Sequence, residues 1–338
     1  MNIPYHIFIA FASVIVIWFL SGILIDATDR VAKRYHKPGF FVAFFVLGFL
    51  TSISEISVMV NATIGGVPSV SAGNLIGASF VIFLLLIPLL AIVGNGVSTH
   101  PILRKRNLFL LLQVVVIPSV FALDGLLTRT EGLICIFLYS LIVYAVHKRA
   151  PLEEITSQTI ANVHHELLPK RKATITDSVK ILIGALSIFF AGKLLVDEAL
   201  FFSQFLQVPP SFIGLLLLSI GTNIPEISIA LRCVLGKHKN IAFGDYMGSA
   251  AANTPLLGIL ILLNGDFAVE NSEFIPTFLL MFPGVILFYI FSFSKEKLSR
   301  KEGTILLLFY IAFVIIQIVN IIRIAPQTHG AAPLLGSI

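Results

Sequence analysis

Residues 221–230, GTNIPEISIA, place a proline and a glutamate side by side inside a segment that is otherwise almost entirely Leu, Ile, Val and Ala. The rest of the chain has the same apolar background, since 57% of its residues are hydrophobic and only 12% are charged. Apolar runs of about 20 residues, the length that spans the hydrocarbon core of a bilayer, recur from end to end. We therefore predict an all-α polytopic membrane protein, with Glu226 in the interior of one span.

The apolar runs predict ten transmembrane helices. They cover residues 5–26, 40–64, 70–97, 107–125, 131–147, 177–203, 211–235, 241–264, 273–293 and 303–323. We expect the first run to be a retained span and not a signal peptide, because no basic residue precedes it and no small-residue cleavage site follows it. The polar segment 148–176 predicts a linker between two five-helix units, residues 1–147 and 177–338.

The distribution of basic residues predicts the orientation in the membrane. Of the 23 Lys and Arg residues, nineteen lie in or beside the loops after odd-numbered helices, while the opposite side has only Arg129 and Arg323. The positive-inside rule then puts the 148–176 linker in the cytoplasm and both termini outside. We expect the cell (inner) membrane, with the lipid bilayer as a partner and no nucleic acid. The oligomeric state stays open.

The two halves of the chain repeat at an offset of 171 residues. LTSISEIS at residues 50–57 is the counterpart of GTNIPEIS. The same offset pairs Asp26 with Asp197, Pro38 with Pro209, Thr51 with Thr222, Glu55 with Glu226, Gly73 with Gly244 and Gly77 with Gly248. Coincident Pro, Asp, Glu and Gly residues in one register indicate a duplication. Because five crossings reverse the chain, we predict inverted repeats, an architecture of secondary transporters whose substrate sites lie near the bilayer midplane.

The two equivalent glutamates, Glu55 and Glu226, lie about fifteen residues into their predicted helices, too deep to reach an interface easily. An ionisable side chain at this depth indicates a functional site. Polar side chains precede each glutamate by three and four residues, on the same helical face. They are Thr51 and Ser52 before Glu55, and Thr222 and Asn223 before Glu226. A hard cation prefers such oxygen ligands, although Thr-Ser-x-x-Glu also resembles a capping box at a helix break.

Two further features add candidate oxygen ligands. Pro225 has no N–H, so we expect the carbonyl of Gly221, four residues earlier, to be free for a cation. The motif GDYMGSAAAN at residues 244–253 brings Ser249 and Asn253 onto one helical face, and its small residues allow close helix packing, as do those of GNLIGAS at residues 73–79.

These motifs resemble those of the calcium/cation antiporter superfamily, of the sodium/calcium exchanger type. The second repeat of that family usually reads Gly-Thr-Ser-x-Pro-Glu, followed by Gly-Asn-x-x-Gly-Ser with Asn or Asp four residues on; GTNIPE and GDYMGSAAAN are similar. The resemblance implies a countertransporter that moves Ca²⁺ against Na⁺ or H⁺ through one alternating-access site, with no cofactor. It implies these ligands: centrally Glu55 and Glu226, beside them Thr51, Ser52, Thr222 and Asn223, and from helix eight Ser249 and Asn253.

The first repeat departs from the family pattern at three positions. Ser54 replaces the proline, so we expect no opened helix there and no free carbonyl at Leu50. Ala78 and Ile82 replace a Ser and an Asn or Asp, which removes two oxygen ligands. Because the two glutamates supply a charge of about −2, we predict exchange of one Ca²⁺ for two monovalent charges, with H⁺ or Na⁺ as the counter-ion.

Other function classes are less well supported by the sequence. A membrane-embedded hydrolase would need a metal-ligating histidine beside the carboxylates, and none lies within a span, so we predict no enzyme. An inverted-repeat transporter of another cation or of a small organic solute stays open, as does a channel. His164 and His165, next to Glu166, predict a plain solvated loop, and Cys135 and Cys233 predict buried free thiols.

Overall fold

The structure, a computed structural model, describes residues 3–33, 52–98, 106–147, 175–224, 226–227, 239–295 and 297–328. Most of this part is helical, which confirms the predicted class. The first half contains α1 (Ile3–Lys33), α4 (Ile53–Ile64), α5 (Pro68–Val81), η2 (Ile82–Leu86), α6 (Ile87–Val93), α7 (Arg106–Phe121), η4 (Ala122–Asp124) and α8 (Arg129–His147). The second half contains α10 (Ile175–Leu206), α11 (Pro210–Ile213), η6 (Gly214–Leu218), α12 (Ser219–Thr222), α14 (Lys239–Asn264), α15 (Asn271–Lys295) and α16 (Arg300–Thr328).

Six helical segments within the described ranges are long and apolar enough to cross a bilayer. They are Ile3–Leu20, Pro68–Val93, Arg106–Asp124, Tyr246–Asn264, Phe274–Phe293 and Arg300–Val319. The predicted spans 40–64 and 211–235 are described only in part, as the shorter apolar helices Ile53–Ile64 and Pro210–Thr222. These helices identify a multi-pass membrane protein, and the full count of ten spans stays a prediction.

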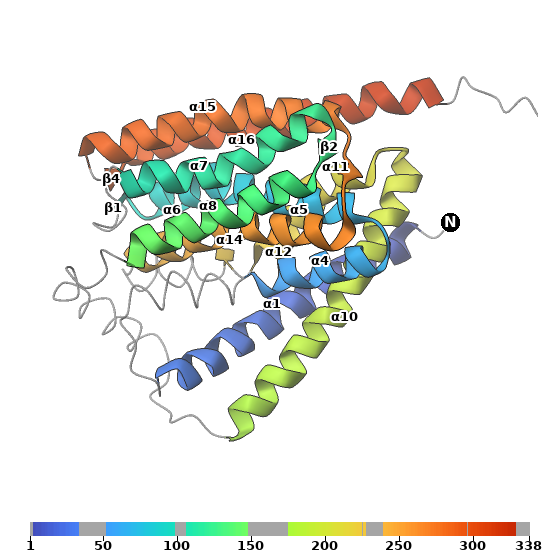
Figure 1. Cartoon of the computed structure of the whole chain (residues 1–338), viewed down its shortest axis with the longest axis horizontal. Coiled ribbons are helices and arrows are strands. Elements are labelled where there is room, and N and C mark those ends of the chain that lie inside the picture. Colours follow the sequence, from blue (N-terminus) through green and yellow to red (C-terminus); the bar gives the residue numbers. More distant parts are fainter. Residues whose placement is uncertain are drawn as a thin grey trace, which may run out of the picture.

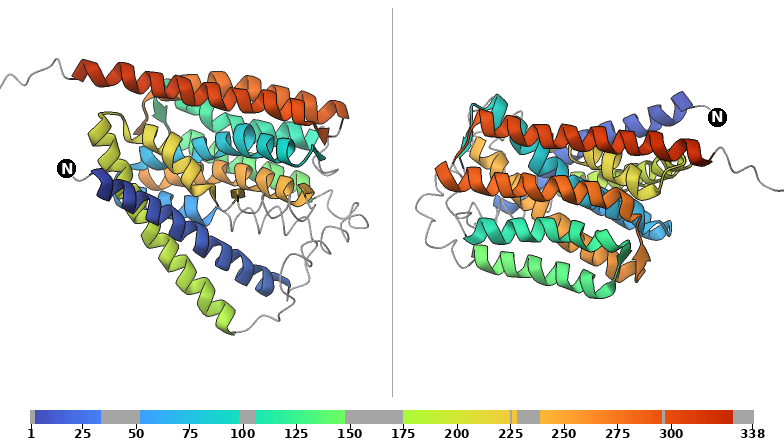
Figure 2. Two further views of the ribbon diagram at one scale, coloured as in Figure 1. Left: turned by 180° about the vertical axis from the view of Figure 1, so that it is seen from behind. Right: turned by 90° about the horizontal axis from the view of Figure 1, so that it is seen from above.

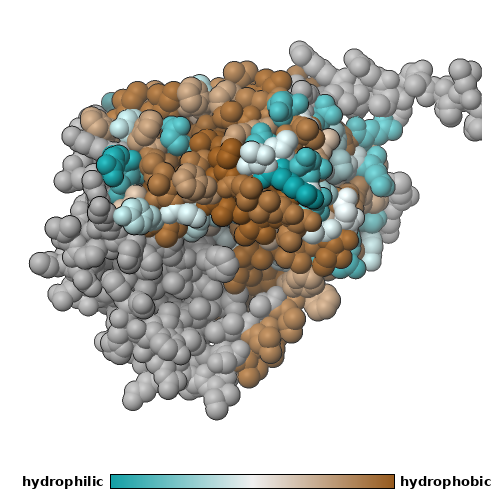
Figure 3. Space-filling view, viewed as in Figure 1, coloured by the Kyte–Doolittle hydropathy of each residue, from teal (hydrophilic) through white to brown (hydrophobic). Residues whose placement is uncertain are grey.

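Large apolar side chains cover much of the described surface. Phe8, Phe137 and Leu279 are 69%, 65% and 61% exposed. Figure 3 shows hydrophobic residues over most of the described face, with hydrophilic residues gathered toward the ends of the long helices. Apolar patches of this extent suit contact with lipid, which solvates them without cost.

Helix α5 lies inside the bundle, between α14 and the broken helix formed by α11, η6 and α12. Its residues from Val70 to Val81 are all buried. Helices α1 and α10 pack along each other at one side, whereas α15 and α16 lie together at the opposite side (Figures 1 and 2). This arrangement surrounds the two glutamate-bearing segments with α5 and α14.

Glycines bring α5 into backbone contact with the broken helix. A Cβ atom on Gly73 would lie 2.0 Å from the carbonyl oxygen of Ser211, and one on Gly77 would lie 2.3 Å from that of Leu215. From the other side, a Cβ atom on Gly214 would lie 2.1 Å from the carbonyl oxygen of Val70. The two helices can approach this closely only because all three positions lack a side chain.

Two short antiparallel ribbons join loops at opposite ends of the bundle. Strand β1 (Val97–Ser98), after α6, pairs with β4 (Lys297–Leu298), between α15 and α16. Strand β2 (Leu126–Leu127), before α8, pairs with β3 (Phe267–Ala268), after α14. Figure 1 shows the β1–β4 ribbon at the left end and β2 at the right end. The third and ninth predicted loops therefore share one end, and the fourth and eighth share the other.

The first turns of α8 and α16 contain the same capping box at the 171-residue offset. In α8, the backbone N–H and hydroxyl of Thr128 donate to Glu131 Oε2 at 2.8 and 2.9 Å. In α16, the equivalent groups of Ser299 donate to Glu302 Oε2 at 2.7 and 2.6 Å. Each glutamate N–H returns a bond to the hydroxyl, which satisfies donors at the helix start. The repeat register thus extends beyond the glutamate motifs.

A π-helical turn shifts that register by one residue in the first half. After η2, strand β1 begins at Val97 and β3 begins at Phe267, which are 170 residues apart instead of 171. The left-handed residues Asn95 and Gly265, with φ of 57° and 79°, have the same spacing of 170. A π turn accommodates one extra residue in a helix. The extra residue in η2 therefore accounts for the changed spacing, and the capping boxes return to 171.

Candidate functional site

The helices that hold the two glutamates change direction at equivalent residues. Ser52 precedes α4 with φ −77° and ψ 8°, and Asn223 follows α12 with φ −87° and ψ 6°. We expected an opened helix only in the second motif, where Pro225 is present. That expectation was wrong for Ser52, whose backbone departs from helix geometry without a proline. Short polar side chains such as Ser and Asn offer the backbone alternative hydrogen bonds and so favour such departures.

Ser54 connects the first glutamate to the second motif. Its hydroxyl lies 2.9 Å from Glu55 Oε2 and 3.1 Å from the carbonyl oxygen of Thr222, and can donate to either. Glu55 is 1% exposed and Thr222 is fully buried. The residue that replaces the family's proline therefore ties the two glutamate-bearing segments together.

The second glutamate is held from α14. Glu226 is fully buried, and its Oε1 accepts a hydrogen bond from Ser249 Oγ at 3.1 Å. Its backbone carbonyl accepts one from the hydroxyl of Tyr246 at 3.0 Å. Ser249 was predicted as a site residue, and the structure brings it to Glu226. Tyr246 was not predicted, because a tyrosine in an apolar helix is most often a packing residue.

Asn74 is a second residue that the sequence did not single out. Its side chain is fully buried, and its Oδ1 accepts a hydrogen bond from Thr222 Oγ1 at 3.2 Å. The bond joins α5 to the end of α12, beside the second motif. The one sequence signal for it is an amide within the small-residue motif GNLIGAS, where close packing already accounts for the glycines.

Two buried carboxamides border the glutamates, and each is anchored by its nitrogen. Asn223 Nδ2 donates to the Ser219 carbonyl at 2.6 Å, and Asn253 Nδ2 donates to Ser79 Oγ at 3.2 Å. The Oδ1 atoms of Asn223 and Asn253 are buried and have no hydrogen-bond partner within the described part of the chain. A buried acceptor without a donor is costly, and a bound cation would satisfy both oxygens.

The electrostatics of this region are those of two buried acids among neutral oxygens. Within the described ranges, the one ion pair joins His6 Nδ1 and Glu198 Oε2 at 2.8 Å and involves neither Glu55 nor Glu226. The same residues contain no cluster of three or more His, Cys, Asp or Glu side chains. Any cation held here would depend on two carboxylates together with hydroxyl, amide and carbonyl oxygens.

Some predicted site residues cannot be compared with the structure. Thr51, Pro225 and Leu50 lie outside the described residues, so the free carbonyls discussed for Leu50 and Gly221 stay predictions. Gly221 itself is buried, and its nearest neighbour on the open side is Val14 of α1. The 148–176 linker with His164 and His165, and Cys233, also lie outside the described residues, whereas Cys135 is a buried free thiol, as predicted.

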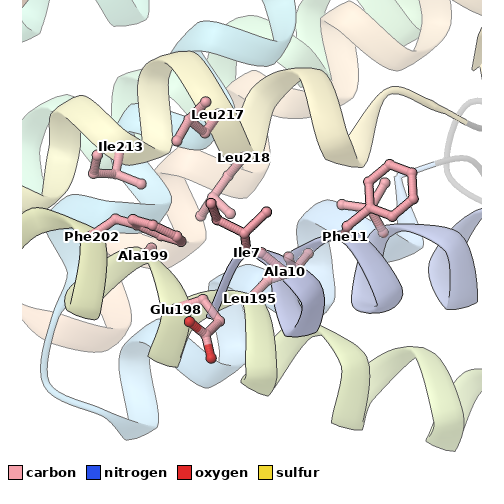
Figure 4. A pocket seen from close by; sticks show the side chains of 11 residues that line it. Ile7, Ala10, Phe11, Leu195, Glu198, Ala199, Phe202, Ile213, Leu217 and Leu218 are labelled. Carbon is pink, nitrogen blue, oxygen red and sulfur yellow. The ribbon is translucent and has the colours of Figure 1, made fainter. Parts of the chain in front are cut away.

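A separate apolar pocket of about 360 Å³ lies between α1, α10 and the broken helix. Figure 4 shows its lining, in which Glu198 is the one charged residue among side chains such as Phe11, Phe202 and Leu217. None of the predicted ligands lines this pocket. It therefore does not coincide with the glutamate site.

Comparison with known proteins supplies the family. The sequence pattern of the sodium/calcium exchanger protein family matches residues 5–148 and 178–319, which include both glutamate motifs. The chain belongs to this family. Its membership confirms the resemblance drawn from GTNIPE and GDYMGSAAAN, and the family is one of transporters, not of enzymes.

Individual relatives are distant but cover most of the chain. The sodium/calcium exchanger MaX1 of Methanosarcina acetivorans is 23% identical over 331 residues, covering 88% of this chain and 93% of its own. The inner membrane protein YrbG of Escherichia coli is 23% identical, covering 75% and 76%. A solved structure of the sodium-calcium exchanger NCX_Mj superposes with a TM-score of 0.62 at 22% identity, covering 92% of this chain and 98% of that one. The last likeness concerns the fold.

Proposed function

We propose that the protein is a secondary active antiporter that exchanges Ca²⁺ for H⁺ or Na⁺ by alternating access through one site near the bilayer midplane. The observation that carries this proposal is the pair of buried carboxylates, Glu55 and Glu226, at equivalent positions of a duplicated motif among neutral oxygens. An ionisable group inside the membrane is costly and is retained for function. The name of MaX1, a sodium/calcium exchanger, supports the same ions.

The proposed ligands follow from the buried oxygens. Glu55 and Glu226 supply the charge and bind the cation from two sides. The remaining oxygens come from the hydroxyl or amide groups of Thr51, Ser52, Thr222, Asn223, Ser249 and Asn253 and from the Gly221 carbonyl. Six to eight oxygen ligands suit Ca²⁺, which tolerates irregular geometry better than Mg²⁺ does. No resident cofactor is proposed, since the cation is the transported substrate.

We further propose ten transmembrane helices in two inverted five-helix units, residues 1–147 and 177–338, joined by a cytoplasmic linker at 148–176. Two ribbons support this count: β1–β4 pairs two odd-numbered loops and β2–β3 pairs two even-numbered loops, as alternating crossings require. The positive-inside rule then puts both termini outside the cytoplasm. The cell (inner) membrane is the proposed location.

The stoichiometry is proposed from what the first motif lacks. Ala78 and Ile82 are both fully buried and apolar, so α5 adds no side-chain oxygen at either position. A site charge of about −2 balances one Ca²⁺, two Na⁺ or two H⁺ without a third monovalent ion. Exchange of one Ca²⁺ for two monovalent charges should therefore be electroneutral.

The test is Ca²⁺ flux in proteoliposomes with Na⁺ gradients, H⁺ gradients or neither. Glu55→Gln and Glu226→Gln should each abolish exchange while the protein still purifies as a folded species, because the amide preserves shape and removes charge. Glu302→Gln is the matched control: this glutamate is also buried but caps α16. Near-normal exchange by either site variant would refute shared coordination, and wild-type flux of organic solutes without Ca²⁺ would favour the alternative solute transporter.

A further inference from the structure

Ser79 occupies an unusual position relative to the duplication. It is equivalent to Ala250 at the 171-residue offset, whereas Ser249 is equivalent to Ala78. The hydroxyl therefore occurs one residue later in α5 than in α14, a displacement of about 100° around the helix axis. Ser79 is 4% exposed, so its side chain is enclosed in the bundle.

The contacts of Ser79 determine which role its hydroxyl has toward Asn253. Ser79 Oγ lies 3.3 Å from the carbonyl oxygens of both Leu75 and Ala250, and these groups can only accept. A hydroxyl has one hydrogen to donate, and the two carbonyls compete for it. Toward Asn253 the hydroxyl is therefore an acceptor, and it receives the Nδ2–H at 3.2 Å.

This arrangement fixes the orientation of the Asn253 amide. A carboxamide has an acceptor at one end and a donor at the other, and a half-turn exchanges them. With Nδ2 held by Ser79, Oδ1 is the end that has no partner in the described structure. Only the oxygen can bind a cation, because the N–H dipole of the other end repels it.

We propose that Ser79 is a positioning residue that holds the carboxamide oxygen of Asn253 available to the transported cation and so sets the affinity for Ca²⁺. Ser79 thereby compensates in part for the oxygens that α5 lacks at Ala78 and Ile82. This inference rests on the proposed function, because it assumes that Asn253 is a ligand.

The test is a double-mutant cycle on the purified full-length protein, read by ⁴⁵Ca²⁺ binding and by the Ca²⁺ dependence of flux. Ser79→Ala should weaken Ca²⁺ affinity about 3-fold to 10-fold, as loss of one neutral hydrogen bond predicts, while the maximal flux stays within about twofold. In an Asn253→Ala background the same substitution should have no further effect. Ser79→Thr keeps the hydroxyl and should restore affinity. Ser71→Ala is the matched control, a fully buried serine on the same helix.

Unchanged affinity in Ser79→Ala, or an equal loss with and without Asn253, would overturn the inference. If Ser79→Ala does not fold, Ser79→Cys replaces it: the thiol nearly preserves volume but is a weak acceptor, so the same loss is expected. Absence of Ca²⁺ binding by the wild type would overturn the proposed function itself. Binding that depends on Glu226 but not on Ser79 overturns the inference alone.

Discussion

The closest backbone contact beside the site, at Gly77, gives the sharpest prediction. A Cβ atom there would lie 2.3 Å from the carbonyl oxygen of Leu215 and 2.9 Å from the Cβ of Ser219. Ordinary contacts begin about 1 Å farther out, and a helix backbone cannot rotate away as a side chain can. Gly77→Ala should therefore push α5 and η6 apart by about 1 Å. The cost expected for such overpacking is about 1–3 kcal/mol.

The displacement should also reach the ligands. The Thr222 Oγ1 to Asn74 Oδ1 bond spans the same interface and is already 3.2 Å long, so a further 1 Å would break it. We expect Gly77→Ala to melt at a lower temperature in detergent and to lose at least about fivefold in Ca²⁺ flux.

Gly284→Ala provides the matched control for this substitution. A Cβ atom on Gly284 would meet only the Cδ2 end of Leu84, at 2.8 Å, and that side chain can move. Melting temperatures and Ca²⁺ fluxes of the two variants should be compared in the same detergent and liposome preparations. Equal values for Gly77→Ala and Gly284→Ala would show that the close approach of α5 to η6 is not required.

Three more outcomes follow from the structure. In a cysteine-free background, Leu126→Cys should react with an impermeant maleimide on intact cells and Lys297→Cys should not, since the β2 and β4 loops lie at opposite ends; the reverse result would invert the topology. His6→Ala should lower the melting temperature more than the double variant His6→Ala/Glu198→Gln does, because the single change leaves a buried carboxylate without its 2.8 Å partner; equal losses would show that the pair is unimportant. Ca²⁺ accumulation at potentials clamped with K⁺ and valinomycin should be flat, whereas net movement of one charge would give about 2.3 kcal/mol per 100 mV.

The sequence was sufficient for the features that repeat. Glu55 and Glu226 stood out because carboxylates are rare in apolar segments and occur here in one register. Ser249 was also predicted, since its spacing in a small-residue motif put it on the site-facing side of α14, and its hydroxyl does bond to Glu226. These predictions needed only helical periodicity and the cost of burying charge.

The sequence did not predict features that depend on contacts between helices. Asn74 and Tyr246 act through bonds to segments about 150 and 20 residues away, and neither bond has a sequence signature. Ser54 was interpreted only as the absence of a proline, whereas its hydroxyl joins Glu55 to Thr222. The π turn η2 was also missed, because periodicity alone does not distinguish one inserted residue in a uniformly apolar run.

The differences between the two repeats have a consequence for transport. In an inverted-repeat transporter, inward-open and outward-open states exchange the conformations of the two halves. Identical repeats would give the two states equal free energies. Here the first motif has Ser54 tied to the second and the π turn η2 after Ala78, whereas the second has Asn253 and Ser249. Each of these contacts is made differently when the halves exchange conformations, so we expect the empty protein to prefer one side of the membrane. Ca²⁺ binding to Glu55 and Glu226, which the two repeats share, should reduce that preference.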